Sequence, residues 1–168
     1  MQVMCDSHQI QICPFDPQYQ LQIEQLVLPI QQIEFKVSIT RDEQPDLVDI
    51  AGVFQHGKGN FWVALHEEHV VGCVGVMDIG SDQVALRKMF VHRDFRGKDL
   101  GVSAKLMATA KDWCRQQGVQ EILLGTTAKM FAAHRFYEKH GFEPLERSEL
   151  PSNFPQVHVD SKFYRCTL

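Results

Sequence analysis

Residues Val84 to Gly118 read VALRKMFVHRDFRGKDLGVSAKLMATAKDWCRQQG, which is a strand pattern, a basic turn and a long helix pattern in succession. The expected strand spans Val84–Val91, and its apolar residues break strict alternation in the middle, as in a strand that carries a bulge or is buried on both faces. From Val102 onward, apolar residues recur on one side of a 3.6-residue period, and Gly118 is placed to end a helix in the left-handed conformation. The apolar positions of this helix are Val102, Leu106, Met107, Ala110, Trp113 and Cys114.

The turn between the strand and the helix is locally basic in a chain whose formal net charge is −4. Five Lys and Arg residues lie between Arg87 and Lys98, against the single acid Asp94. The free N–H groups of a helix's first turn, and the positive end of its dipole, face the turn that precedes it. This arrangement predicts the binding of an anion such as a phosphate group.

The run Arg96–Gly101, RGKDLG, resembles the acyl-CoA pyrophosphate loop of the GNAT N-acetyltransferase superfamily. The family pattern is Arg or Gln, two residues, Gly, one residue, and Gly or Ala. Arg96 and Gly101 match this pattern, whereas Asp99 stands where the first glycine is expected. An aspartate at that position would repel a pyrophosphate, and it could serve instead as the N-cap of the helix.

A second run, Ala133–Phe142, AHRFYEKHGF, resembles the Ala-x-x-Phe-Tyr-Glu-Lys-x-Gly-Phe run near the C-terminus of the same superfamily. The two motifs occur in the family's order. The resemblance therefore implies an α/β (α+β) GNAT fold, with a mixed, mostly antiparallel sheet of six to seven strands, four flanking helices and splayed central parallel strands. We expect residues 1–168 to form a single GNAT acetyltransferase domain.

The resemblance also implies site residues. Main-chain groups of Met89, Phe90 and Val91 would contact the pantetheine arm of acetyl-CoA, and Arg96 would bind its pyrophosphate. Tyr137 would be the catalytic proton donor to the departing thiolate, since a phenol with a pKa of ~10 stays protonated at neutral pH; the alternative is a core aromatic residue. Met130 replaces an asparagine that touches the cofactor in many members. The backbone N–H groups expected at the pyrophosphate belong to Gly97, Lys98, Asp99, Leu100, Gly101 and Val102.

The implied reaction moves an acetyl group from acetyl-CoA to a primary amine of a small molecule, protein or peptide, by direct attack through a tetrahedral intermediate. The alternative is a non-catalytic acyl-CoA-binding module, because the chain departs from the family at Asp99, at Met130 and at the position of the general base. Many relatives carry a glutamate on the central strand, but Ala85, Arg87 and Lys88 occupy that region here. Glu34 is interpreted as a solvated surface side chain, so no base is assigned.

Composition limits the remaining functions. With 168 residues and 44% hydrophobic content the chain suits one compact domain, and its acidic balance argues against nucleic-acid or anionic-membrane partners. Five cysteines without a CxxC pair indicate reduced thiols, and no leader or membrane-spanning pattern is present, so we expect a cytoplasmic protein. We expect no metal, because His66 and His69 flank a hairpin turn that faces solvent.

The rest of the chain supplies the other elements. The first helices and the loop Ser148–Gln156 are expected to shape the acceptor site, and the exposed final strands can pair between subunits, so a homodimer is one possible assembly. His134 and Arg135 are assigned to the solvent-exposed face of the last helix.

The remaining expected strands are Gln9–Cys13, Asn60–Leu65, Val70–Ile79, Gln120–Gly125, one beginning at Phe142–Leu145, and Val157–Leu168 with a break near Asp160-Ser161. The remaining expected helices run from Gln18 to Pro29, Pro45–Phe54 and Ala128–His140.

Overall fold

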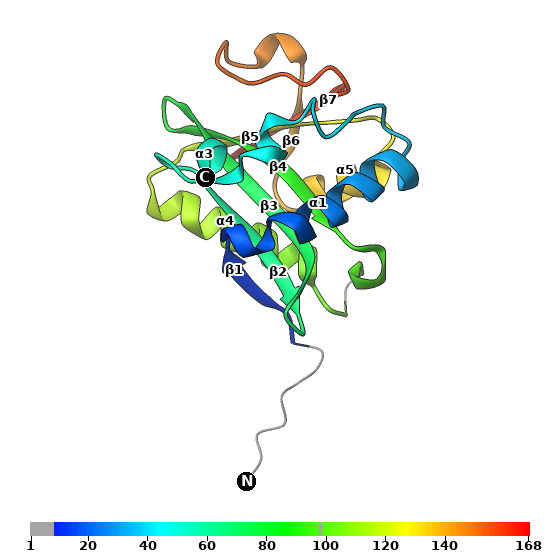
Figure 1. Ribbon diagram of the computed structural model, residues 1–168. Helices are drawn as coiled ribbons and strands as arrows, with labels where there is room; N and C mark the ends of the chain where they lie inside the picture. Colours follow the sequence, from blue (N-terminus) through cyan, green and yellow to red (C-terminus); the bar gives the residue numbers. More distant parts are fainter. Residues whose placement is uncertain (1–8, 98) are drawn as a thin grey trace.

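The computed structural model describes residues 9–97 and 99–168, which form one seven-stranded sheet with helices on both faces (Figure 1). Expected site residue Lys98 lies outside the described residues. The strands are β1 (Gln11–Pro14), β2 (Asn60–His66), β3 (His69–Gly80), β4 (Gln83–Val91), β5 (Glu121–Thr126), β6 (Glu143–Leu145) and β7 (Lys162–Thr167). The α-helices are α1 (Gln20–Pro29), α2 (Pro45–Val48), α3 (Ile50–Phe54), α4 (Val102–Gln116) and α5 (Phe131–Lys139).

The sheet has the order β1-β2-β3-β4-β5-β7-β6 and is mostly antiparallel, as predicted. Strands β1 to β4 form an antiparallel meander, and β4 and β5 form a parallel pair connected by α4. The β2–β3 hairpin turns at Glu67 and Glu68, whose φ angles of 50° and 67° match the twist that a two-residue hairpin needs. After β5 the chain forms α5 and returns through β6 and β7.

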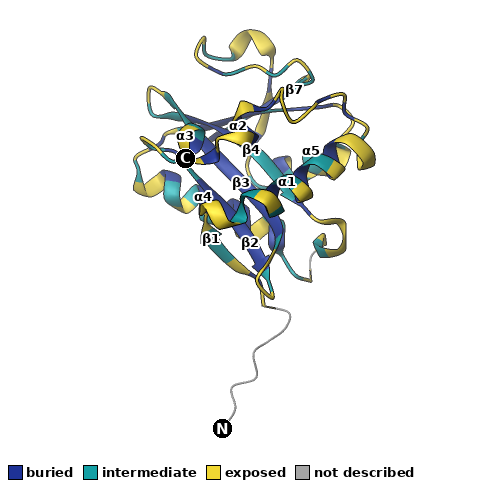
Figure 2. Cartoon of the chain, in the orientation of Figure 1, coloured by how far each residue is buried: buried dark blue, intermediate teal, exposed yellow. Residues whose placement is uncertain are grey.

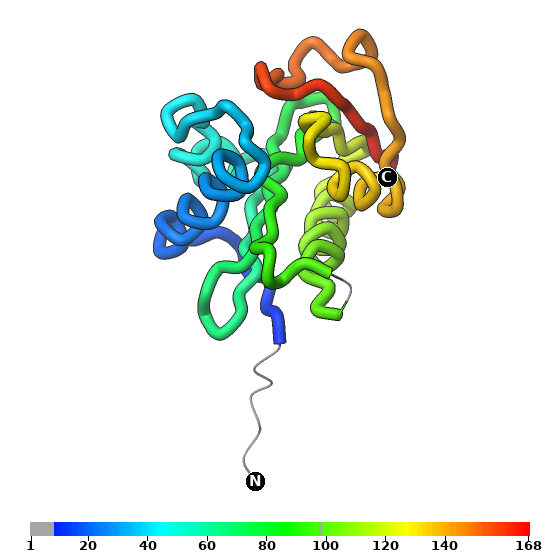
Figure 3. The backbone as a smooth tube through the Cα atoms, turned by 90° about the vertical axis from the view of Figure 1, so that its right-hand side faces the viewer, coloured from blue at the N-terminus to red at the C-terminus, as the bar shows by residue number. Residues whose placement is uncertain are grey.

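The two larger apolar cores lie on opposite faces of the sheet, and a third, smaller one is formed by Ala85, Leu123, Leu145, Phe154 and Phe163. In Figure 3 the blue and cyan helices α1 to α3 lie on one side of the sheet and the green and yellow helices α4 and α5 on the other. Figure 2 shows the buried strands between helices whose outer faces are exposed. On α4 the buried residues include Leu106, Met107 and Ala110, as the sequence period predicts, and Gly118 after this helix has a φ of 76°.

The second predicted helix is wrong as a single element. It is broken at Asp49, whose non-helical backbone (φ −120°, ψ 69°) separates α2 from α3 and whose side chain accepts a hydrogen bond from the Gly52 N–H at 3.1 Å. The described chain therefore has five α-helices where four were expected. The first helix also differs, because beyond Pro29 it continues as a π-helical turn over Ile30–Glu34.

Gly75 on β3 lies where two aromatic rings approach the backbone closely. A Cβ atom at this position would lie 2.6 Å from the ring of Phe61 and 2.8 Å from that of Phe54. The absence of a side chain therefore lets α3 and β2 pack against the middle of β3. Within the described ranges, no helix combines the length and the apolar composition that crossing a lipid bilayer requires.

Candidate active site

The central parallel strands separate soon after they pair. Strands β4 and β5 share only three aligned positions, from Gln83 with Glu121 to Ala85 with Leu123. Beyond Ala85, β4 continues along β3, while β5 continues along β7 as far as Thr126. The predicted splay is confirmed, and it leaves the main chain of β4 facing a gap instead of a neighbouring strand.

A β-bulge lies in β4 at this gap. Arg87 pairs with Gly75 and Phe90 with Cys73, so two residues of β4 oppose a single residue of β3. Lys88 has a φ of 55°, and its carbonyl oxygen lies 3.1 Å from the Cys73 Sγ. The irregular alternation of the strand pattern is explained by this bulge, which changes the direction of Arg87 and Lys88.

Two cavities open from the gap, and both are lined by Met89, Phe90, Met130, Ala133 and Tyr137. We call them the turn-side cavity and the loop-side cavity. The other lining residues of the turn-side cavity are Ile30, Phe35, Val91, Arg96, Gly97, Ser103, Ala132 and Phe136. Those of the loop-side cavity are Gln31, Val37, Ile39, Leu86, Arg87, Lys88, Gly125, Thr126, Thr127, Phe154, Pro155, Val157, Val159 and Asp160.

Six of the expected site residues therefore meet in the turn-side cavity: Met89, Phe90, Val91, Arg96, Gly97 and Tyr137. The remaining expected residues of the described chain, Asp99 to Val102, lead into α4 and line neither cavity. Asp99 is exposed, Leu100 is half-buried, Gly101 is the helix N-cap and the side chain of Val102 is buried in the core.

The N-cap interpretation of Asp99 is wrong. Helix α4 is capped at Gly101, whose φ of 61° lies in the left-handed region, and no side chain of the residues that the structure describes caps this helix. The backbone N–H groups of the first turn are thus left without a side-chain partner. The carboxylate of Asp99 is not needed to start the helix.

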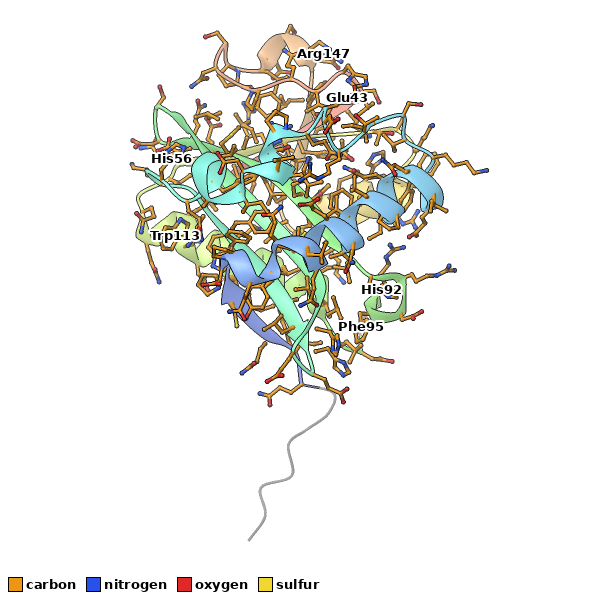
Figure 4. All side chains as sticks on the ribbon, in the orientation of Figure 1. Glu43, His56, His92, Phe95, Trp113 and Arg147 are labelled. Carbon is orange, nitrogen blue, oxygen red and sulfur yellow. The ribbon has the colours of Figure 1, made fainter. Side chains whose placement is uncertain are left out.

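Arg96 is held at the mouth of the turn-side cavity. Its Nε donates to the Val91 carbonyl oxygen at 2.8 Å, and its Nη2 donates to the Glu34 carboxylate at 2.8 Å. The guanidinium lies 5.8 Å from the centre of the Phe35 ring. Its hydrogen bonds lower the pKa of Glu34, so this glutamate is an ion-pair partner as well as the exposed residue that the sequence predicted. The segment before Arg96 forms a 3-10 turn that begins after His92 and ends at Phe95, both labelled in Figure 4.

Tyr137 lies between the two cavities. It projects from α5 and is 7% exposed, and its ring packs beside those of Phe142 and Tyr164 at 5.6 and 5.9 Å. Burial raises the pKa of its hydroxyl, with smaller contributions from Asp160 and Tyr164. Within residues 9–97 and 99–168 no hydrogen bond to this hydroxyl is present, so it lacks the local partner that a purely structural tyrosine would use.

His134 on the same helix does not lie on the wet face, contrary to the sequence prediction. It is 8% exposed, and its Nε2 lies 2.9 Å from the carbonyl oxygen of Thr127. This contact connects α5 to the segment that follows β5, and α5 begins at Phe131, three residues later than the predicted Ala128. Arg135 is exposed as predicted.

The loop-side cavity contains a buried charge cluster. Arg87 Nε and Lys88 Nζ each lie 3.1 Å from the Asp46 Oδ2, and the side chain of Lys88 is only 8% exposed. Burial lowers the pKa of Lys88, while the nearby Asp46 opposes that shift. These two cations therefore line the loop-side cavity, although the sequence pattern groups them with the basic residues of the turn before α4.

Asp160 brings a second carboxylate to this cavity from the segment before β7. A Cβ atom on Gly125 would lie 2.5 Å from its Oδ2, so only glycine at the end of β5 leaves room for this carboxylate. Burial raises the pKa of Asp160, and Arg87 and Lys88 partly oppose that effect. In the described ranges, no group of three or more His, Cys, Asp and Glu side chains is arranged to hold a metal ion.

A family model described as an acetyltransferase (GNAT) domain matches residues 57–144, more than half of the chain. The chain belongs to the GNAT acetyltransferase family. Among solved structures, this GNAT protein superimposes on an acetyltransferase of the GNAT family from Staphylococcus aureus Mu50 with a TM-score of 0.90 and 34% identity, over 94% of this chain and 98% of that one. The PaiA N-acetyltransferase of Thermoplasma acidophilum, solved in complex with coenzyme A, shares the fold at 12% identity, with a TM-score of 0.73 over 95% of this chain and 99% of that one.

Curated relatives give a similar result. The GNAT chain is 30% identical to an Escherichia coli protein described as the uncharacterized N-acetyltransferase YjgM, over 70% of this chain and 74% of that protein. It is 35% identical to the N-acetylaspartate synthetase of Danio rerio over 62% of this chain, but this match covers only 37% of that protein.

Asp46 and Asp160 are the residues of this GNAT site that sequence reasoning missed. Asp46 follows a proline in the first turn of a short helix, where an acidic residue is common, and Asp160 lies in a break before the last strand. Neither position carries a motif. Their surroundings distinguish them from surface acids, because Asp46 is buried against Arg87 and Lys88, and the half-buried Asp160 lines the same cavity as these two cations.

Proposed function

We propose that the protein is an acetyl-CoA-dependent N-acetyltransferase that acts on a primary amine. The observation that carries this proposal is the pair of cavities that meet at Tyr137 and at the main chain of Met89 and Phe90. Two substrates that enter from opposite sides would meet at this point, as transfer between them requires.

In this proposal acetyl-CoA occupies the turn-side cavity. The backbone N–H groups from Gly97 to Val102, together with Arg96, would bind the pyrophosphate, because the first turn of α4 carries the positive end of the helix dipole. The pantetheine arm would contact the main chain of Met89, Phe90 and Val91, which β5 leaves unpaired. The related structure solved with coenzyme A supports this class of co-substrate.

Direct attack by the acceptor amine is favoured over an acyl-enzyme route. Burial raises the pKa of both Cys73 and Cys114 to about 12, so neither thiol would ionise near neutral pH. We therefore propose that the amine attacks the thioester carbonyl and that Tyr137 donates a proton to the departing thiolate. Its raised pKa keeps the phenol protonated until the thiolate forms.

The acceptor would occupy the loop-side cavity, where Arg87 and Lys88 share the single carboxylate of Asp46 and so leave a net positive charge. Cations suit an acceptor that carries a carboxylate as well as its amine. One relative is named an N-acetylaspartate synthetase, which supports testing amino acids first. We also propose that the chain works as a single domain, since strands from both ends of the described residues enter the same sheet.

The test is a calorimetric titration with acetyl-CoA, followed by thiol release in the presence of L-aspartate, L-glutamate, glycine, spermidine and a peptide with a free amino terminus. Micromolar binding with amine-dependent release of CoA is the expected result. Binding without release for any amine would favour the alternative, a non-catalytic acyl-CoA-binding module. Absence of binding would reject both.

A further inference from the structure

The carboxylate of Asp160 is fixed in position by its neighbours. Arg147, labelled in Figure 4, donates to the backbone carbonyl of Asp160 at 3.0 Å, and the Asp160 N–H donates to the Val157 carbonyl at 3.0 Å. The next residue, Ser161, donates from its N–H to the carbonyl of Thr126 at 2.9 Å. The segment is therefore tied to the end of β5, and the carboxylate lies over Gly125 in the loop-side cavity.

This carboxylate has no partner of its own within the described chain. The residue is half-buried, and no hydrogen bond or ion pair reaches its carboxylate oxygens from residues 9–97 or 99–168. The nearby cations Arg87 and Lys88 pair with Asp46. Partial burial without a partner disfavours the ionised carboxylate, and a cationic ligand would offset that cost.

We infer that Asp160 binds the ammonium group of the acceptor and accepts its proton before the amine attacks. The inference rests on the proposed function. Asp160 and Tyr137 line the same cavity, so the acceptor nitrogen would lie between the carboxylate and the thioester carbonyl next to Tyr137. Asp160 would then be the general base that the sequence did not reveal.

The proton balance of the step is complete. The substrate ammonium R–NH3+ gives one proton to the Asp160 carboxylate, which later releases it to solvent. The neutral nitrogen forms a bond to the acetyl carbon, and the carbon–sulfur bond breaks as the thiolate takes a proton from Tyr137. The second nitrogen proton restores the phenol, and the net reaction is R–NH3+ plus acetyl-CoA to R–NH–COCH3, CoA–SH and H+.

Several charged groups face Asp160 and set its titration. Arg87 and Lys88 on β4 and Arg147 after β6 lower its pKa, whereas Asp46 on α2 raises it. Burial has the largest effect and leaves the pKa above its ordinary value. A base with a raised pKa accepts a proton more readily from a bound ammonium group, which suits the role inferred from its position.

The test compares the pH dependence of kcat/KM for the wild type, Asp160→Asn and Asp160→Glu, using acetyl-CoA and the amine of the panel that releases CoA fastest. We expect Asp160→Asn to lose about 100-fold at neutral pH and to recover as rising pH deprotonates the free amine. Asp160→Glu should retain the fall of kcat/KM at low pH that the wild type shows. A wild-type profile for Asp160→Asn would overturn the inference while leaving the transferase intact, whereas absence of release by the wild type would overturn both.

A stability measurement distinguishes this role from a structural one. Because the folded-state pKa is raised, the ionised carboxylate destabilises the folded protein at pH values above that pKa, and the penalty disappears below the unfolded pKa of ~3.9. Asp160→Asn should therefore unfold at a higher temperature than the wild type at pH 7, with no gain near pH 3. The exposed Asp42→Asn is the control and should change neither measurement. A lower unfolding temperature for Asp160→Asn at pH 7 would indicate a structural partner and overturn the inference.

Discussion

Arg96 and Glu34 are separated by 62 residues in the sequence and form an ion pair at the mouth of the turn-side cavity, with Nη2 2.8 Å from Oε1. The pair positions a guanidinium beside the turn that precedes α4, and it also places a carboxylate there. A bound pyrophosphate and Glu34 would compete for the same donor groups of Arg96. The pair thus limits the affinity for the anion that the turn is proposed to bind.

Replacement of Glu34 by Gln should tighten acetyl-CoA binding. The change removes a negative charge next to the phosphate-binding turn and frees Arg96, and an exposed pair of this kind is worth ~0.2–1 kcal/mol, so we expect an increase of about threefold. Calorimetric titration at low salt measures it. The control is Glu24→Gln, which removes another Arg pair, with Arg41, whose two residues line neither cavity. Weaker binding by Glu34→Gln would mean that Glu34 holds Arg96 in its binding position.

Replacement of Tyr137 by Phe should lower turnover and spare cofactor binding. Phe keeps the ring contacts with Phe142 and Tyr164 but removes the proton that the thiolate needs, so kcat should fall by about 100-fold with the Kd for acetyl-CoA nearly unchanged. Steady-state kinetics and calorimetry measure the two effects.

The matched control for that change is Tyr164→Phe. The Tyr164 hydroxyl donates to the Glu138 carboxylate at 2.7 Å, so its loss should cost about 1 kcal/mol of stability with little change in kcat. Equal losses of kcat and affinity in Tyr137→Phe would indicate that Tyr137 is a packing residue.

Replacement of Asp99 by Gly should strengthen acetyl-CoA binding. Asp99 is exposed, does not cap α4, and carries a negative charge in the turn, so its removal should be worth ~0.5–1 kcal/mol, or about two- to fivefold in Kd. Titration of acetyl-CoA checks the change, which should shrink as salt is added. Asp94→Asn, another exposed acid in the same segment, is the comparison. Unchanged affinity would show that the Asp99 carboxylate points away from the pyrophosphate.

Replacement of Asp46 by Asn should destabilise the protein by about 3 kcal/mol, because it leaves Arg87 and the buried Lys88 without their counter-charge. Urea unfolding at pH 7 measures the loss. The folded-state pKa of Lys88 is already lowered, and without Asp46 it should fall further, so the penalty should be greatest below that pKa and diminish as pH rises and Lys88 becomes neutral. A loss of less than 1 kcal/mol would show that the cations find other partners.

Two kinds of local structure were misjudged from the sequence. The backbone break at Asp49 has no strong sequence signal, since an apolar helical period continues across it from Leu47 to Ile50. His134 is predicted to be exposed because it precedes the charged Arg135 on the last helix. Its burial depends on the Thr127 carbonyl, which the fold places within reach of the ring.

The sequence by itself determined the strand, turn and helix of residues 84–118, and a bulge was one of the two explanations it offered for the irregular alternation of β4. These features follow from periodicity and turn chemistry, which act between residues close together in the chain. The order of the elements and the roles expected of Arg96 and Tyr137 came from the resemblance of two motifs to the GNAT family. The tertiary structure decided which charges share a cavity. Arg87 and Lys88 precede Arg96 by only nine and eight residues, but the bulge directs them to Asp46 and the loop-side cavity. The carboxylate of Asp46 reaches these two cations, and that of Asp160 reaches the loop-side cavity, from distant segments of the chain. No local pattern encodes these contacts, and partial burial in the cavity raises the pKa of Asp160.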